Sequence, residues 1–297
     1  MPIEEKKKLI ENPRSPSVQN SASDVPWAQL RIPSFPQISI RILQLANNDT
    51  APMRRLSDLI SSDAGFSSEV LTLANSPLYA RRTSVTTVNQ AIALIGTEAL
   101  KGLCLTVGVR AYLGKALKQE SIRAVWRHSL ACALIAEQIA SAANTDKDSA
   151  YTAGILHDIG RLGLSVLHPQ HYASLLQSHI GDSHSLLESE RALFGFDHCE
   201  AGFNLVADWN LPPEFESVLS RHHSPPQDTG PWTMLDLIGL SCRMADATGF
   251  SVFPGCESPS YPELFQQLPP REQKSFYPDV HILAFDIANK INALETN

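Results

Sequence analysis

Two polar residues, His157 and Asp158, stand side by side in the apolar segment AGILHDIGRLGL, residues 153–164. Burying a polar pair is costly unless each group finds a partner. The pair therefore either satisfies its own polar groups with its neighbours or holds a metal ion. Neighbouring residues on a helix lie about 100° apart. Both side chains could thus flank one point inside the fold, and the carboxylate could bridge two ions.

Five further histidines and carboxylates are candidate ligands, because they lie in or beside separate segments with helical apolar spacing. Neutral imidazole nitrogens and carboxylate oxygens suit Fe, Mn, Zn, Ni or Co, and five or more such ligands are enough for two ions. A single buried histidine is more often structural, so we expect the other five histidines to be structural or exposed. The candidate metal ligands are His128, His157, Asp158, His198, His222, His223 and Asp246.

The elements that must position these residues are predicted to be helices, because apolar residues recur with a period near 3.6. No segment alternates with period two for long enough to form a sheet, so the sequence predicts an all-α fold. Asp148 or Ser149 is the expected N-cap of the helix that carries His157 and Asp158. Asn75 and Ser76 are expected to cap a helix or brace the helical packing. The predicted helices cover residues 38–46, 53–63, 67–76, 88–113, 122–143, 148–167, 184–194, 198–209, 213–223, 232–249 and 278–294.

Composition narrows the class of protein. The net charge of -7 argues against a nucleic-acid partner, which would favour a basic stripe or patch. The five cysteines are widely spaced without a C-x-x-C pair, which suits reduced thiols in a cytoplasm. The chain lacks an apolar signal segment and a run of about 18 apolar residues. We therefore expect a soluble, cytoplasmic protein that does not span a membrane.

Together these residues resemble a known family. The order of the candidate ligands is similar to that of the HD superfamily of metal-dependent phosphohydrolases and, more narrowly, of the HDOD domain, a bacterial regulatory relative. The resemblance covers roughly residues 28–225 and rests on six phrases. These are IPSFP, LISSDAGFSSEVLTLANSPLY, SVTTVNQAIALIGTEALKGL, WRHSLACALIAEQIA, AGILHDIGRLGL and FGFDHCEAGFNLVADWNLPPEFESVLSRHHSP.

The resemblance implies a stack of helices that acts in bacterial signalling or gene-expression control. HDOD domains are often joined to response-regulator, kinase or cyclic-di-GMP-related modules, and we expect this domain to stand nearly alone. The expected organisation is a disordered polar tail at 1–25, an HDOD domain at 26–225 and a C-terminal helical extension at 226–297. That extension is expected to complete the metal site and to pack on the core. Clusters of Pro and Gly near 225–231 and 254–270 are expected to be loops.

Many HDOD domains have lost the metal ligands, but this chain resembles the related HD-GYP phosphodiesterases at all seven positions. The resemblance implies two divalent ions, with Asp158 shared between them. One ion would be held by His128, His157, Asp158 and Asp246. The other would be held by Asp158, His198, His222 and His223.

Other positions depart from the HD-GYP pattern. The GYP element that should follow the histidine pair is absent, because HHSPPQDTG stands there. Ala124 replaces a glutamate that recruits a third ion in some relatives. Arg161 stands where HD hydrolases commonly have a lysine, and its charge could meet a phosphate group. The implied catalytic residues are Asp158 and Arg161.

Two functions therefore remain open. The first is a signalling protein that binds a protein partner and uses its metal site for structure or sensing. The alternative is a metal-dependent phosphodiesterase or phosphohydrolase acting on a cyclic dinucleotide or another phosphate-containing ligand. In that enzyme two ions would activate a water molecule and Arg161 would clamp the substrate. A di-iron oxygenase of HD type is a third, weaker interpretation. The absent GYP element favours the signalling protein.

Overall fold

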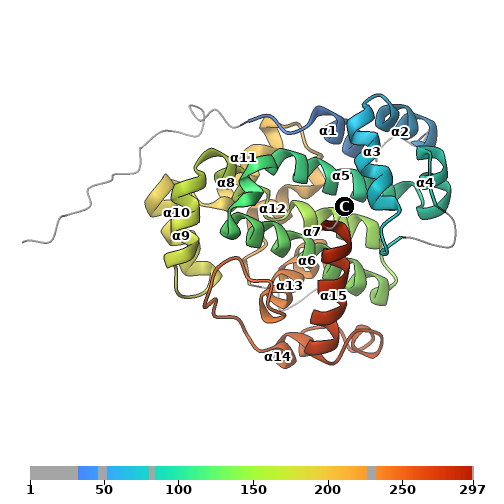
Figure 1. Cartoon of the computed structure of the whole chain (residues 1–297). Helices are drawn as coiled ribbons and strands as arrows, with labels where there is room; N and C mark the ends of the chain where they lie inside the picture. Colours follow the sequence, from blue (N-terminus) through green and yellow to red (C-terminus); the bar gives the residue numbers. More distant parts are fainter. Residues whose placement is uncertain (1–32, 46–51, 80–83, 226–231, 296–297) are drawn as a thin grey trace, which may run out of the picture.

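The computed structural model describes residues 33–45, 52–79, 84–225 and 232–295 (Figure 1). The predicted tail at 1–25 and most of the predicted loop at 225–231 lie outside these residues. The described parts are helical apart from short connections and one isolated bridge between Gly181 and Cys256. The all-α prediction is therefore confirmed.

The helices follow one another along the chain with short connections. In the first half they are α1 Gln37–Gln44, α2 Pro52–Ser61, α3 Ala64–Ala74, α4 Val88–Ile95, α5 Thr97–Leu113, α6 Glu120–Ala143 and α7 Lys147–Leu156. In the second half they are α8 Ile159–Leu167, α9 Pro169–Ser178, α10 Ser183–Phe194, α11 His198–Asp208, α12 Glu216–Arg221, α13 Met234–Ala247, α14 Tyr261–Gln266 and α15 Val280–Glu295.

Helix α6 lies at the centre of the fold, and α7, α8, α9, α13 and α15 all pack against it (Figure 1). Its run from Leu130 to Ala136 is buried on every side, as expected of a helix that is apolar all round. Helix α15 is joined to α6 by an ion pair between Arg127 and Glu295 at 2.5 Å. Gln138 also donates a hydrogen bond to Asp286 at 2.9 Å.

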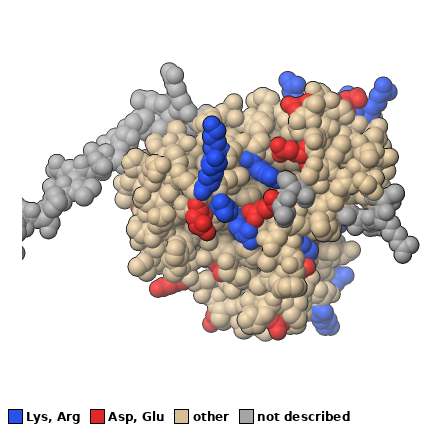
Figure 2. All heavy atoms as spheres, in the orientation of Figure 1, with Lys and Arg blue, Asp and Glu red and all other residues tan. Residues whose placement is uncertain are grey.

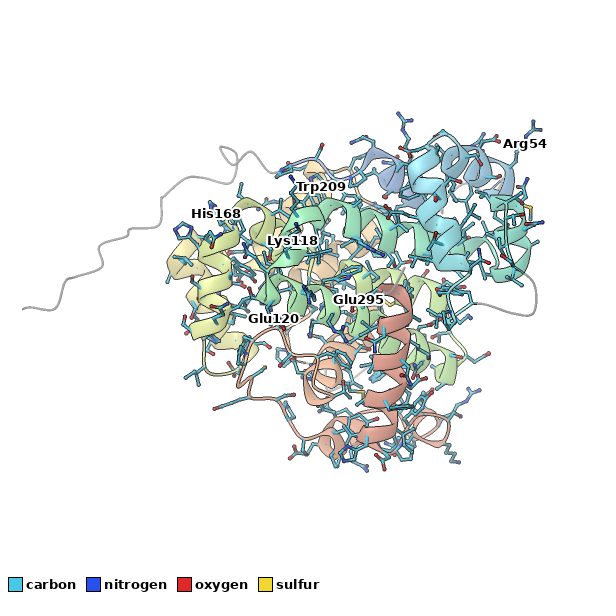
Figure 3. All side chains as sticks on the ribbon, viewed as in Figure 1. Arg54, Lys118, Glu120, His168, Trp209 and Glu295 are labelled. Carbon is cyan, nitrogen blue, oxygen red and sulfur yellow. The ribbon has the colours of Figure 1, made fainter. Side chains whose placement is uncertain are left out.

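Aromatic side chains from the segment before α1, from α5 and from the end of α11 form a cluster. Trp209, which is labelled in Figure 3, stacks on Phe35 with ring centroids 5.0 Å apart. Tyr112 meets the same indole edge-on at 5.1 Å. In α3, Asn75 is the C-cap residue, as expected. Its amide donates to Val85 O and accepts from Val85 N, both at 2.7 Å, so it braces the segment before α4.

Two predicted helices are each divided in the structure. The segment 88–113 breaks at Gly96, whose φ of 88° lies in a region that favours glycine. The segment 148–167 breaks at His157 and Asp158, where Asp158 leaves helical geometry at φ -101° and ψ 21°. The N-cap of α7 is Asp146, not Asp148 or Ser149, because Asp146 accepts from both of their backbone N–H groups. The expected loop at 254–270 contains α14.

Two glycines hold the HD turn against its neighbours. A Cβ atom on Gly154 would collide with Ala133 Cα, so α7 and α6 touch through their backbones. A Cβ atom on Gly160 would collide with the carbonyl oxygen of His198 and would lie 2.6 Å from Gly202 N. The backbones of α8 and α11 therefore approach so closely that only glycine fits, which brings Asp158 beside His198.

The surface and the helix lengths bear on the expected partners. On the face shown in Figure 2, Lys and Arg side chains lie beside Asp and Glu side chains and do not merge into one basic patch. Within the described parts of the chain, no helix has both the length and the apolar character needed to cross a bilayer.

We expect Gly160→Ala to lower the free energy of unfolding by about 1–3 kcal/mol or more, because the new methyl group overpacks two backbones. Gly163→Ala in the same helix is the control, since its Cβ would meet only Leu205 Cδ1 at 3.2 Å. Urea unfolding of both variants is the measurement. Equal stabilities would contradict the close contact between α8 and α11.

Candidate metal centre

The candidate ligands come from four parts of the fold and meet in its interior. His128 lies in the middle of α6, and the HD pair forms the turn between α7 and α8. His198 is the first residue of α11, after a capping box at Asp197, and His222 directly follows α12. Each of these five ligand side chains is at most 2% exposed. His223 is only partly buried.

Asp158 lies at the centre, with two histidines on the side of each carboxylate oxygen. Its Oδ1 atom is 3.4 Å from His198 Nε2 and 3.3 Å from His222 Nε2. Its Oδ2 atom is 3.6 Å from His157 Nε2 and 3.9 Å from His128 Nε2. The side chain of Asp158 is thus positioned between two pairs of imidazole rings.

All four rings turn Nε2 toward Asp158 and hold Nδ1 with a hydrogen-bond acceptor. For His128, His157, His198 and His222 the acceptors are, in that order, Phe250 O at 2.8 Å, Gly154 O at 2.6 Å, Glu190 Oε2 at 2.6 Å and Val218 O at 3.1 Å. These partners assign the proton to Nδ1 and leave the Nε2 lone pairs facing the centre. Metal-binding histidines show the same outer hydrogen bonds.

Several central atoms have no hydrogen-bond partner: His157 Nε2, His222 Nε2, Asp158 Oδ1 and Asp246 Oδ1. Burial lowers the pKa of His157 to about 3 and also lowers that of His222, so both rings are neutral. Burial raises the pKa of Asp158, but Arg161 and the nearby histidines lower it further, so the carboxyl stays ionised. Lone pairs that face one another in a buried space need a cation, so the residues fit a metal ion.

The potential ligand atoms form two groups, and the atoms within each group lie within 4.8 Å of one another. The first group consists of His128, His157 and Cys242. The second group, which matches the implied second site, consists of Asp158, His198, His222 and His223.

Sequence reasoning missed Cys242, whose Sγ atom is 3.4 Å from His128 Nε2. It lies four residues before Asp246 on α13, so both residues point to one side of the helix. That spacing was the available signal. A lone cysteine without a motif did not reveal it.

Asp246 lies on the Nδ1 side of the His128 ring, whereas Asp158 lies on the Nε2 side. The Oδ1 atom of Asp246 is 3.4 Å from His128 Nδ1, not from Nε2. Burial raises the pKa of Asp246 to about 6, although His128 opposes the rise. The structure therefore brings Asp246 to the centre, against the outer edge of a candidate ligand. Its role as a direct ligand stays a prediction.

Arg161 is buried within the cluster, at 1% exposure. Its five N–H donors face five acceptors inside the chain. They are Asp158 Oδ2 at 2.8 Å, Tyr172 Oη at 3.3 Å, Glu190 Oε1 at 3.3 Å, His198 Nε2 at 3.2 Å and His223 Nε2 at 3.3 Å. The expected role of Arg161 as a substrate clamp stays a prediction.

Glu190 and Tyr172 are further residues of the centre that the sequence did not reveal. Glu190 is fully buried, accepts a hydrogen bond from Tyr172 at 2.7 Å, and accepts from His198 N at 2.9 Å. Burial and the adjacent Arg161 lower the pKa of His198, whereas the Glu190 carboxylate raises it. Because His198 Nε2 faces a guanidinium that only donates, we assign the neutral ring with its proton on Nδ1.

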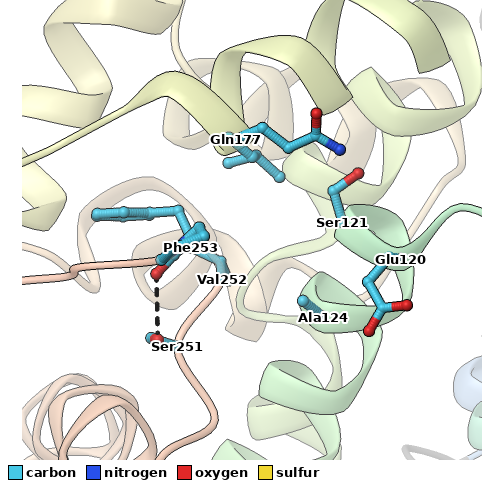
Figure 4. Close-up of a pocket in the computed structure, with 9 residues that line it drawn as sticks. Glu120, Ser121, Ala124, Gln177, Ser251, Val252 and Phe253 are labelled. Atoms are coloured by element: carbon cyan, nitrogen blue, oxygen red, sulfur yellow. Dashed lines mark hydrogen bonds between the residues drawn. The ribbon is translucent and has the colours of Figure 1, made fainter.

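A cavity of about 270 Å³ lies beside α6, close to the cluster (Figure 4). Ala124, one turn before His128, lines it together with Ser121, Gln177 and Phe253. The carbonyl of Phe253 accepts a hydrogen bond from Ser251 at 3.2 Å. Where some relatives carry a glutamate for a third ion, this chain thus has a methyl group facing a cavity. None of the candidate ligands lines that cavity.

Comparisons with solved structures show what the fold is similar to. An HDOD domain protein of unknown function from Geobacter sulfurreducens is 22% identical, with a TM-score of 0.67 over 90% of this chain and 93% of that chain. A "putative phosphohydrolase" from Shewanella amazonensis SB2B is 21% identical, with a TM-score of 0.64 over 89% and 93%. A "putative signal transduction protein" from Marinobacter aquaeolei VT8 is 21% identical, with a TM-score of 0.67 over 89% and 59%.

At these identities the likeness concerns the fold alone. No curated protein matches the chain. A family model of the HDOD domain matches residues 32–225, well over half of the sequence. The buried HD turn, the surrounding histidines and this match lead to one conclusion: the chain belongs to the HDOD domain family.

Proposed function

We propose that this protein is a metal-binding regulatory component of bacterial signal transduction, with a protein partner. One observation carries the metal binding. Four histidines, each held at Nδ1, aim Nε2 at a single buried carboxylate, and two of those Nε2 atoms have no hydrogen-bond partner. Such an arrangement is costly without a cation.

The donor set indicates the class of ion. His128, His157 and Asp158 would hold it, and the Cys242 thiol lies beside them. Imidazole, carboxylate and sulfur donors favour Zn or Fe over Mg or Ca, which prefer oxygen ligands alone. When bound, such an ion supplies positive charge and Lewis acidity to the cluster. The chain itself orients the His128 ring through the carbonyl group of Phe250 and the His157 ring through that of Gly154.

Burial supports regulation over fast hydrolysis. The side chains around Asp158 are at most 2% exposed, and Arg161 directs all of its donors to acceptors within the chain. A phosphodiester needs both an open approach to the ion and donors that position it. The description of the Marinobacter protein as a signal transduction protein agrees with this proposal.

The alternative is a metal-dependent phosphohydrolase acting on a cyclic dinucleotide or another phosphoester. The specific observation in its favour is the meeting of five expected histidine ligands around Asp158. Two Shewanella proteins of similar fold are described as a phosphohydrolase and a metal-dependent phosphohydrolase, both marked "putative". In this case Asp158 would be the central catalytic ligand.

We expect the purified protein to contain a transition metal and to lose thermal stability when a chelator removes it. Binding to the folded state alone stabilises by about 4 kcal/mol when the free ion exceeds its Kd about 1,000-fold. His157→Gln should abolish this metal-dependent shift in Tm. His179→Gln is the control, because His179 is buried outside the cluster and contacts Ser185 at 3.1 Å. A wild-type protein that takes up neither Fe²⁺, Mn²⁺ nor Zn²⁺ would contradict the proposal.

We expect turnover below about 1 s⁻¹, the lower end of typical enzymes. The forms loaded with iron, manganese and zinc should each be assayed on cyclic-di-GMP, cyclic-di-AMP and bis-nitrophenyl phosphate. Faster turnover that Asp158→Ala abolishes would favour the phosphohydrolase instead.

A further inference from the structure

The guanidinium group of Arg161 lies inside the second group of ligand atoms. Its Nη2 atom is 3.2 Å from His198 Nε2 and 3.3 Å from His223 Nε2, and these two Nε2 atoms are 3.1 Å apart. Its Nε atom donates to Asp158 Oδ2 at 2.8 Å. Three of the four residues that would hold a second ion thus already contact a cation that belongs to the chain.

A metal ion and this guanidinium compete for the same lone pairs. An ion bonded to His198 and His223 would lie about 2.0–2.1 Å from each Nε2 atom. It would then lie against Nη2, which always carries positive charge and has no lone pair to offer. Binding there requires that Arg161 leave.

The rest of the network holds Arg161 in place. Its Nη1 atom lies 3.3 Å from both Glu190 Oε1 and Tyr172 Oη. Glu190 is fully buried, and the Arg161 guanidinium is the positive charge beside it. Removing one partner of such a buried ion pair is strongly destabilising. Displacing the guanidinium would therefore leave Glu190 as a buried carboxylate that keeps its hydrogen bonds from Tyr172 and His198 but has lost its positively charged partner.

The charges of the cluster point to a single ion. The buried carboxylates of Asp158, Glu190 and Asp246 carry three negative charges when ionised, and Arg161 supplies one positive charge. One divalent cation balances the remainder, whereas two would leave an excess of positive charge in a buried space. Such an excess is expensive in a low-dielectric interior.

We propose that Arg161 takes the place of the second ion and that the chain binds one divalent transition metal, at His128, His157 and Asp158 beside Cys242. Arg161 is then a positioning residue that sets the number of ions, and it is not a group that contacts substrate. This inference rests on the proposed metal binding.

The test is the number of ions per chain, measured by elemental analysis and by calorimetric titration with Mn²⁺ and Zn²⁺. We expect one ion in the wild type and two in Arg161→Met, which removes the charge and keeps much of the side-chain length. Arg123→Met, an exposed position on α6, is the control and should keep one ion.

A second variant keeps the proposal testable if Arg161→Met does not fold. His223 lies in the second group alone and is partly exposed, so His223→Ala should still bind one ion, whereas His157→Ala should bind none. Two ions in the wild type, a single ion in folded Arg161→Met, or loss of an ion in His223→Ala would each overturn the role of Arg161. No ion in the wild type would instead remove the proposed metal binding itself.

Discussion

The buried carboxylate of Asp158 is the group on which the arrangement of the core depends. Taking a carboxylate out of water costs several kcal/mol even after the protein relaxes. Arg161 compensates Oδ2 at 2.8 Å, but Oδ1 faces the lone pairs of His198 and His222. The helices that bring these groups together must therefore be held by packing elsewhere. Gly154 and Gly160 allow that packing, because each removes the side chain that would keep α7 from α6 or α8 from α11.

The two sides of Asp158 differ in what neutralises them. On the side of His198, a fixed guanidinium and the Glu190 carboxylate form a network that spans α8, α9, α10 and α11. On the side of His128 and His157, Arg161 reaches only Asp158 Oδ2 through Nε, while its other donors turn to the opposite side of the carboxylate. The guanidinium group of Arg161 belongs to the chain and cannot be removed by a chelator, whereas a bound metal ion can. In the proposed one-ion arrangement, the half of the centre held by Arg161 would be permanent, and the other half would respond to metal supply.

The centre extends beyond the part of the chain that the family model matches. Residues 32–225 supply the histidines and Asp158, but α13 supplies Cys242 and Asp246, and the carbonyl of Phe250 holds His128 at Nδ1. Helix α13 packs directly on α6 and α7. The C-terminal segment thus sets the environment of the first ligand group, which differs from the second group in having a thiol.

The sequence by itself determined the all-α class and most of the helices, because 3.6-residue periodicity is a local property of the chain. It also marked the candidate ligands, since ligand types in apolar segments are visible without a fold. It did not show that His157 and Asp158 end one helix and precede another, because a broken helix keeps its apolar period. Nor did it reveal Cys242, Glu190 and Tyr172, or the buried position of Arg161. Those depend on which helices cross. A lone thiol, carboxylate or guanidinium gains its role only from the charges that tertiary packing places beside it.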